Sequence, residues 1–180
     1  MNAFELALKA LKQNNVNNKI KLVDQLHSLK EQTKLNYQAE YPIRSVKAPG
    51  RPKKPNLVRF QNIPKRDKSD LGFIKTIHAI CHIEFNAINL ALDALYRFRD
   101  MPDTFYQDWI QVAFEESQHF QLLNNYLAEL GYHYGDFDAH NGLWKMTHET
   151  DYDVLARMAL VPRVLEARGL DATPKIQARF

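Results

Sequence analysis

Two stretches between residues 71 and 130 carry apolar side chains at the three- and four-residue steps typical of an amphipathic helix. At about 100° per residue, the apolar face of the first helix is centred on Glu84 and comprises Ile77, Ile80, Ile88, Ala91, Leu95 and Phe98. The apolar face of the second is centred on Glu116 and comprises Phe105, Trp109, Val112, Phe120, Leu123, Leu127 and Leu130. The turn at residues 101–104 is short, so the helices should be antiparallel. Glu84 and Glu116 are therefore predicted to face one interior.

The second helix adds a histidine one turn beyond its central glutamate, in the step Glu116-Ser117-Gln118-His119. A Glu-x-x-His step places a carboxylate and an imidazole on adjacent turns of one helix face, where both can bind the same cation. A buried carboxylate normally takes up a proton or a partner, and a metal ion is one such partner. The pattern predicts a metal site formed by Glu84, Glu116 and His119. An isolated Glu-x-x-His step is also common on solvated helix faces.

The remaining periodicity predicts further helices on either side of this pair. Residues 3–12 and 17–36 each have one apolar face and should form two N-terminal helices. Residues 132–150 are rich in Gly, Asp and His and are predicted to form a loop. A third core helix should begin at Asp151, and the face that carries Glu166 also carries Tyr152, Leu155, Ala159 and Pro162. Glu166 is a further metal-ligand candidate, with an ion pair to a nearby arginine as the alternative.

Composition places these elements in one domain. The chain has 180 residues, of which 45% are hydrophobic and 25% charged, which is sufficient for one sizeable core. A single cysteine excludes an internal disulfide framework and fits a reducing compartment. The N-terminus has no signal-peptide pattern, and no apolar run is long enough to cross a bilayer. We expect one cytoplasmic domain with N-terminal helices at 1–40, a strap at 41–68 and an incomplete bundle core at 69–180.

The strap, residues 41–68, differs in composition from the rest of the chain. It contains five prolines and nine lysines or arginines against one acid, Asp67. This composition predicts an extended segment with polyproline character. Its charge fits the phosphate backbone of RNA, but its only aromatic residues are Tyr41 and Phe60, and a long surface connection is usually solvated. RNA binding and plain solvation are both compatible with the strap.

Two other groups of polar residues are weaker ligand candidates. His78 and His82 have the i, i+4 spacing that can chelate a metal, but about 120–160° of helix rotation separates them from Glu84. They cannot share its site, and their face is expected to meet solvent or the N-terminal helices. Three arginines of the third core helix lie off the Glu166 face and are expected at the surface: Arg157, Arg163 and Arg168.

The sequence stops soon after a helix start signal. Thr173 and Pro174 are typical of the N-cap and the first position of a helix, yet only six residues follow. We expect either a fragment or truncated reading frame, or a second chain that supplies the missing helix in trans. Loss of a core helix would expose apolar faces, which favours a homo-oligomer.

Five stretches together resemble the bacterial ferritin-like family labelled domain of unknown function 455. They are residues 48–58 in the strap, 78–85, 115–120, 140–144 and 165–174. The resemblance implies an all-α, ferritin-like antiparallel helical bundle with extra N-terminal helices and ligands in the order Glu, Glu-x-x-His, Glu, Glu-x-x-His. Glu84 is the first ligand by this order, Glu116 and His119 form the next pair, and Glu166 is the third. The last Glu-x-x-His has no counterpart here, so the fourth core helix is missing or incomplete.

The resemblance implies a non-haem di-iron protein that activates oxygen to oxidise or hydroxylate an unidentified substrate. It would hold two iron ions if the missing helix is supplied, and manganese fits the same ligands. These relatives include tRNA-hydroxylating enzymes, which keeps an RNA substrate open beside a small molecule. Two alternatives to this metal-dependent oxidoreductase are a non-catalytic bundle, or truncated homologue, without a working metal centre, and a basic RNA-binding module.

Overall fold

The computed structural model describes residues 1–63 and 66–163. Regular structure in these residues is helical, and strand pairing is limited there to two isolated bridges, so the all-α prediction is confirmed. The helices are α1 (Ala3–Leu11), α2 (Val16–Glu31), α3 (Asp70–Arg97), α4 (Asp103–Glu129), α5 (Gly142–Glu149) and α6 (Val154–Met158). A 3₁₀ turn at Phe60–Asn62 precedes α3, and a π-helical segment at Ala159–Arg163 follows α6. Within the described ranges, no helix combines the length and the apolar character needed to span a membrane.

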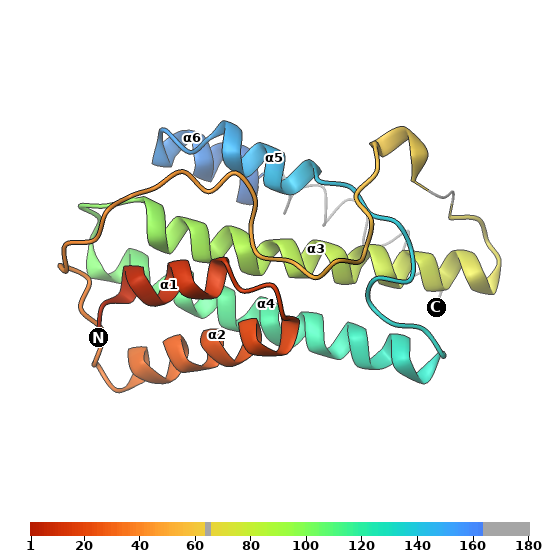
Figure 1. The fold of residues 1–180 in the computed structure, drawn as a ribbon, viewed down its shortest axis with the longest axis horizontal. Coiled ribbons are helices and arrows are strands. Elements are labelled where there is room, and N and C mark those ends of the chain that lie inside the picture. Colours follow the sequence, from red (N-terminus) through yellow and green to blue (C-terminus); the bar gives the residue numbers. More distant parts are fainter. Residues whose placement is uncertain (64–65, 164–180) are drawn as a thin grey trace.

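The two long helices α3 and α4 form the centre of the molecule and run antiparallel, as predicted (Figure 1). Ser69 is the N-cap of α3, and its side chain accepts a hydrogen bond from the backbone N–H of Gly72. Gly131 follows α4 at a φ of +80°, a conformation that glycine adopts without strain. α1 packs on α3 and α2 packs on α4, while α5 and α6 lie beside α3 on the side away from α2.

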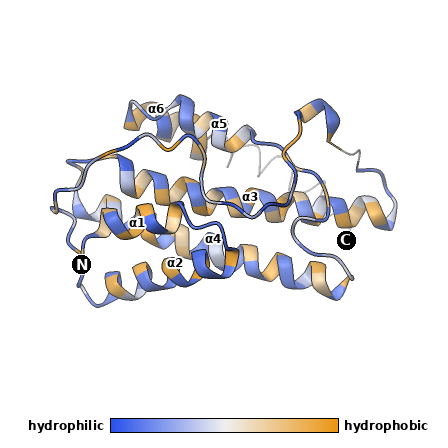
Figure 2. Cartoon of the chain, viewed as in Figure 1, coloured by the Kyte–Doolittle hydropathy of each residue, from blue (hydrophilic) through white to orange (hydrophobic). Residues whose placement is uncertain are grey.

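Apolar residues recur along both long helices (Figure 2). Most of the predicted face of α3 is buried, whereas the buried face of α4 is rotated from the predicted one. In α3, Ile77, Ile88 and Leu95 are buried as expected. The buried residues of α4 are instead Tyr106, Ile110, Ala113, Ser117, Phe120 and Leu127. This face is turned by about 70° from the predicted one, because α4 packs against both α2 and α3. Glu116 therefore lies at the edge of the packed face and not at its centre.

The two N-terminal helices are confirmed, with one shifted end. Asn2 and Asn15 cap them through their side chains. α2 ends at Glu31 and not near residue 36, because Thr33 adopts a positive φ of 52° that terminates the helix. The burial of Lys19 was not predicted. This side chain is fully buried, and its amino group donates to the carbonyl oxygens of Ala10 and Leu11 and to Asn89 Oδ1. This amino group closes the C-terminal end of α1.

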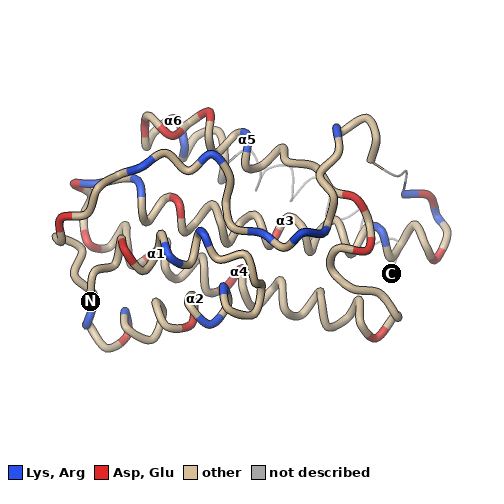
Figure 3. The backbone as a smooth tube through the Cα atoms, in the orientation of Figure 1, with Lys and Arg blue, Asp and Glu red and all other residues tan. Residues whose placement is uncertain are grey.

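The strap is extended, as predicted, and backbone groups hold it against the helices. The Tyr96 hydroxyl donates to the carbonyl of Pro42, and the indole N–H of Trp144 donates to the carbonyl of Lys47. Gly50 lies so close to α1 that a Cβ atom there would come within 2.3 Å of the Lys12 backbone. The exposed cations of this anchored strap are Arg44, Lys47, Lys53, Lys54, Arg59, Arg66 and Lys68. Figure 3 shows lysine and arginine positions in blue along the strap.

The prediction for residues 132–163 is wrong in two respects. Residues 142–149 form α5 where a loop was expected, because Trp144 and Thr147 are buried on one face of a short helix. The third core helix is also not as expected: α6 has five residues, and Tyr152 and Leu155 are 79% and 75% exposed. The buried side chains of this segment come from the opposite face and include Arg157 and Val161.

A buried ion cluster explains this reversal. Arg157, expected at the surface, is fully buried and donates from Nη1 to Asp93 Oδ2 at 2.8 Å. Asp93 in α3 also pairs with Arg97, at 2.7 Å. An arginine that shares a buried aspartate on another helix turns inward, although its own helical wheel places it on the polar side. Three of the sequence predictions, for Glu166, Arg168 and the Thr173-Pro174 start signal, lie outside the described residues, as does the side chain of Arg163.

Candidate metal centre

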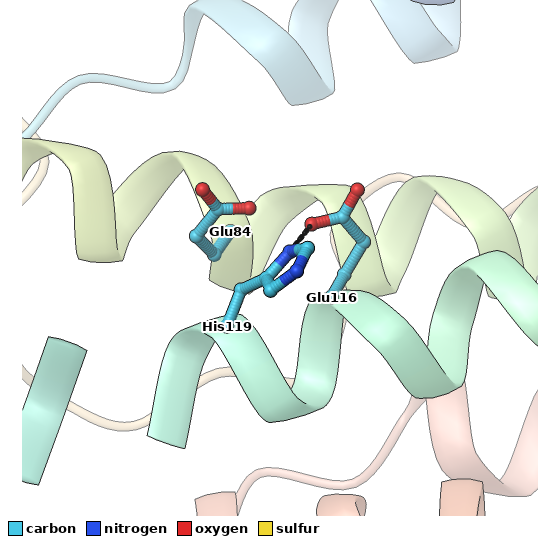
Figure 4. Close-up of side chains that lie close together, drawn as sticks. All are labelled: Glu84, Glu116 and His119. Atoms are coloured by element: carbon cyan, nitrogen blue, oxygen red, sulfur yellow. Dashed lines mark hydrogen bonds and ion pairs between the residues drawn. The ribbon is translucent and has the colours of Figure 1, made fainter. Parts of the chain in front are cut away.

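Glu84 of α3 and Glu116 and His119 of α4 come together where the two long helices meet (Figure 4). One ligand atom from each residue lies within 4.8 Å of the other two. A metal ion lies about 2.0–2.2 Å from carboxylate or imidazole ligands, so donors on opposite sides of one ion are about 4.2 Å apart. Small rotations of these side chains therefore suffice to place all three on one ion. The structure brings together three of the four predicted ligands, and the fourth, Glu166, lies outside the described residues.

The two carboxylates occupy a partly buried position with an excess of negative charge. Burial is the main cause that raises the pKa of Glu84 to about 8, and a hydrogen bond and the negative charge of Glu116 act in the same direction. Glu84 therefore keeps its proton at neutral pH in the protein alone. A cation bound between the two carboxylates would favour the ionised form and reverse this effect.

Glu84, Glu116 and His119 make polar contacts with one another. His119 Nδ1 lies 3.2 Å from Glu116 Oε2, which is the ion pair drawn in Figure 4. Among the described residues, no lysine or arginine forms an ion pair with Glu84 or Glu116. The Glu116 side chain is 24% exposed and the His119 side chain 55% exposed, so an ion can reach them from solvent. Carboxylate oxygens with one imidazole suit iron or manganese, and the donor set thus fits the implied metals.

The histidine pair on the other side of α3 faces neither solvent nor the N-terminal helices, the two environments that were predicted for it. His78 and His82 are 1% and 8% exposed, and they lie beneath residues 132–141 and not against solvent or the N-terminal helices. His78 Nε2 accepts a hydrogen bond from the backbone N–H of Gly135 at 2.9 Å. His82 Nδ1 lies 2.9 Å from the Tyr134 hydroxyl, and its Nε2 lies 3.1 Å from the carbonyl of His140.

These contacts assign a structural role to the pair. His82 Nε2 lies 3.1 Å from both the His140 carbonyl, which only accepts, and the Asn86 amide nitrogen, which only donates, while the Tyr134 hydroxyl can do either to Nδ1. In either tautomer, the nitrogen without a proton therefore faces a donor from the protein. Burial lowers the pKa of both histidines to about 4, so both rings are neutral at physiological pH. The acceptor nitrogens of both rings are thus already used by protein donors. The sequence argument that excluded these histidines from the Glu84 site agrees with the geometry, whereas their expected neighbours were wrong.

Comparison with known proteins places the chain in a family. The family model described as "Protein of unknown function (DUF455)" matches residues 12–180. The chain belongs to this family. The match takes in the strap, α2 to α6 and the candidate ligands Glu84, Glu116, His119 and Glu166.

An uncharacterized protein of Haemophilus influenzae (strain ATCC 51907 / DSM 11121 / KW20 / Rd) is similar to this DUF455 chain. The two are 48% identical over 182 residues, an alignment that covers 95% of this chain and 63% of the relative. The DUF455 chain thus corresponds to less than two thirds of the length of that relative. No solved structure matches the chain.

Proposed function

We propose that this chain forms a ferritin-like carboxylate metal centre in which Glu84, Glu116 and His119 bind iron. The observation that carries the proposal is the convergence of these three side chains from two helices, without a lysine or arginine partner for either glutamate among the described residues. Glu166 is proposed as a further carboxylate ligand, and manganese fits the same donors. In helix-bundle proteins of this class, single glutamates and Glu-x-x-His steps project inward from facing helices. Here Glu84 and the 116–119 step also come from facing helices, but they lie at the edge of the packed face and are partly open to solvent.

Each side chain has a distinct part in this proposal. Glu116 interacts with both Glu84 and His119, so its two oxygens can bind ions together with either residue. Glu84 holds a proton in the protein alone and releases it when a cation binds. Iron bound here would supply oxygen activation, and the proposed reaction of this oxidoreductase is oxidation or hydroxylation of a small-molecule or RNA substrate. A centre with two ions needs ligands beyond these four, which we propose come from a further segment of a longer protein or from a second chain.

Metal analysis of protein purified without chelator tests this proposal directly. We expect bound iron or manganese, and we expect Glu116→Ala to lose it. Glu115→Ala is the matched control, because Glu115 is an exposed glutamate on the same turn of α4 and should leave the metal content unchanged. A folded protein that binds neither metal would contradict the proposal and support the non-catalytic bundle.

The strap supports a second candidate function, binding of RNA. Its exposed cations Arg44, Lys47, Lys53, Lys54 and Arg59 form no ion pair with the described residues, and the backbone beneath them is anchored. The strap crosses α3 at Tyr96, about 120° around the helix from Glu84, so RNA on the strap would not lie directly on the proposed metal site.

Salt dependence tests this second function. We expect RNA affinity to fall steeply with salt concentration, and to weaken when Lys53→Gln and Lys54→Gln are combined. The control removes the same number of charges from exposed positions on and just after α2, with Lys21→Gln and Lys34→Gln. Equal loss in both double variants, or no loss in either, would count against a specific role of the strap.

A further inference from the structure

A cavity of about 640 Å³ lies at the end of the bundle where α3 turns into α4. Its walls come from the first turn of α1, residues 37–42, the turn at residues 99–101 and the first turns of α4. This volume is within the range typical of small-molecule sites. The cavity lies about 20 Å along α3 from Glu84, at a rise of about 1.5 Å per residue. It is therefore separate from the candidate metal centre.

Arg99 is the positively charged group of the cavity. Its guanidinium carbon lies 3.6 Å from the centroid of the Phe4 ring, and its Nη2 donates to the carbonyl of Tyr41 at 3.3 Å. Its Nη1 is buried and has no hydrogen-bond partner. No carboxylate of the described residues lies within ion-pair distance of Arg99. Because guanidinium stays charged at neutral pH, this arrangement leaves a cation that is suited to an anionic oxygen.

Aromatic rings form much of the remaining wall. Tyr37 and Tyr106 are stacked, with ring centroids 5.5 Å apart and planes inclined by 15°. Phe4 meets Tyr106 edge-on, with centroids 5.4 Å apart. The Tyr106 hydroxyl accepts a hydrogen bond from the backbone N–H of Met101 at 3.2 Å, which fixes that ring. A ligand with a planar apolar part can stack on such a surface.

Two exposed acids, Glu40 and Asp100, also line the cavity and determine the charge of a suitable ligand. Together they outweigh the single charge of Arg99, so a simple anion would meet net repulsion. A ligand with one carboxylate and one ammonium group matches both signs. We propose that the cavity binds a free α-amino acid with an aromatic side chain. Its carboxylate pairs with Arg99, its ammonium group faces Asp100 and Glu40, and its ring stacks beside Tyr37.

Residues 38–41 can move to admit such a ligand, while the Tyr96 hydroxyl holds the carbonyl of Pro42 next to them. They lie outside the helices, and the bond that ties them to Arg99 is a long one to the Tyr41 carbonyl. The side chain of Gln38 adds one hydrogen bond to Asp103 at 3.1 Å. A carboxylate that replaces the Tyr41 carbonyl can accept from Nη1 and Nη2 together. One weak neutral hydrogen bond is then exchanged for a charge-assisted bidentate pair, which also provides the unpartnered Nη1 with an acceptor.

Calorimetric titration with three related molecules tests this proposal. L-Phenylalanine carries both charges, 3-phenylpropionate lacks the ammonium group, and phenethylamine lacks the carboxylate. We expect L-phenylalanine to bind and each analogue to bind at least about tenfold more weakly. Absence of binding by phenylalanine, tyrosine and tryptophan at millimolar concentration would overturn the proposal. Equal binding of 3-phenylpropionate and phenylalanine would also overturn it.

Conservative variants of the cation and of one acid in the cavity test the same proposal in proteins that should still fold. Arg99→Lys retains the charge but lacks the planar fork, and we expect about tenfold weaker binding of phenylalanine. Asp100→Asn tolerates the positive φ of 57° at this position and should fold, while it reduces the preference for phenylalanine over 3-phenylpropionate. Lys9→Gln, an exposed charge change on α1, is the control and should bind like the wild type. Thermal unfolding of each variant verifies the fold, and unchanged binding in folded Arg99→Lys and Asp100→Asn would overturn the assignment.

Discussion

Helix α3 carries two polar clusters on opposite sides, and they differ in what the protein leaves unpaired. On one side His78 and His82 are buried, and their acceptor nitrogens face donors from the protein. On the other side Glu84 is partly buried beside Glu116, and no lysine or arginine of the described residues pairs with either. Both clusters have spacings that can bind a metal. In the first cluster, protein groups already hydrogen-bond to the ring nitrogens that could bind a metal. In the second cluster, the glutamates have no lysine or arginine partner among the described residues.

This difference shows that ligand spacing alone does not identify a metal site. The i, i+4 histidine pair has a favourable spacing, but binding a metal there would break hydrogen bonds that hold residues 132–141 on α3. The glutamate cluster has the less regular arrangement, across two helices, and a metal there would stabilise the ionised form of Glu84, which burial and the charge of Glu116 disfavour in the protein alone. Four predictions test the contrast between the two sides.

Metal affinity should show the largest difference. Combining Glu84→Gln with Glu116→Gln removes two carboxylates from the proposed site, and we expect iron(II) or manganese(II) affinity to fall by at least about a hundredfold. Combining His78→Gln with His82→Gln should leave the affinity within about threefold of the wild type, provided that the protein folds. Competition with a chromophoric chelator measures both. Loss of metal in the histidine variant alone would reverse the assignment of the two clusters.

In the metal-free protein, a substitution in the histidine pair should reduce stability more than a substitution in the glutamate cluster. His82→Ala leaves the Tyr134 hydroxyl and the His140 carbonyl without a partner and opens a void, so we expect a loss of about 3 kcal/mol. Glu84→Ala should cost less than about 1 kcal/mol, because it removes a partly buried carboxylate beside another. Urea unfolding in the presence of a chelator gives both values. Equal costs would mean that the two sides are equally structural.

The pH dependence of stability should have opposite signs on the two sides. His82 has a pKa of about 4 in the folded protein against 6.5 in the unfolded chain, so its contribution to stability falls as pH decreases from 6.5 to 4. Glu84 has a pKa of about 8 against 4.5, so its contribution falls as pH increases from 4.5 to 8. We expect His82→Gln to flatten the first trend and Glu84→Gln the second, measured by urea midpoints across pH. Trends that both variants leave unchanged would show that other groups control the pH response.

Chemical modification of histidines should disturb the protein least and should still distinguish His119 from the buried pair His78 and His82. His119 is 55% exposed, so diethyl pyrocarbonate should modify it in the folded protein, and bound metal should protect it. His78 and His82 should react only after unfolding, because they are 1% and 8% exposed. Mass spectrometry of peptides identifies the modified residues. Rapid modification of His78 or His82 in folded protein would contradict their burial.

Much of the fold could be predicted because the signals are local. Apolar residues at helical spacing predicted α1, α3 and α4, and Ser69 and Gly131, at two of their ends, are residue types typical of helix ends. The short turn after α3 gave the antiparallel arrangement of the long pair. The 70° rotation of the α4 face could not be read from α4 alone, because it depends on two neighbouring helices at once. α5 was missed for a similar reason, since its buried Trp144 bonds to the distant strap.

The sequence by itself determined α1 to α4, their order and the spacing that lets Glu116 and His119 share a face. These depend on interactions between residues three or four positions apart, which the chain carries wherever it folds. The tertiary structure decided which polar groups are satisfied: it buried Arg157 against Asp93, gave His82 its partners and left Glu84 beside Glu116. A buried charge or hydrogen bond depends on a group far away in the sequence, and only the packed chain brings that group within reach.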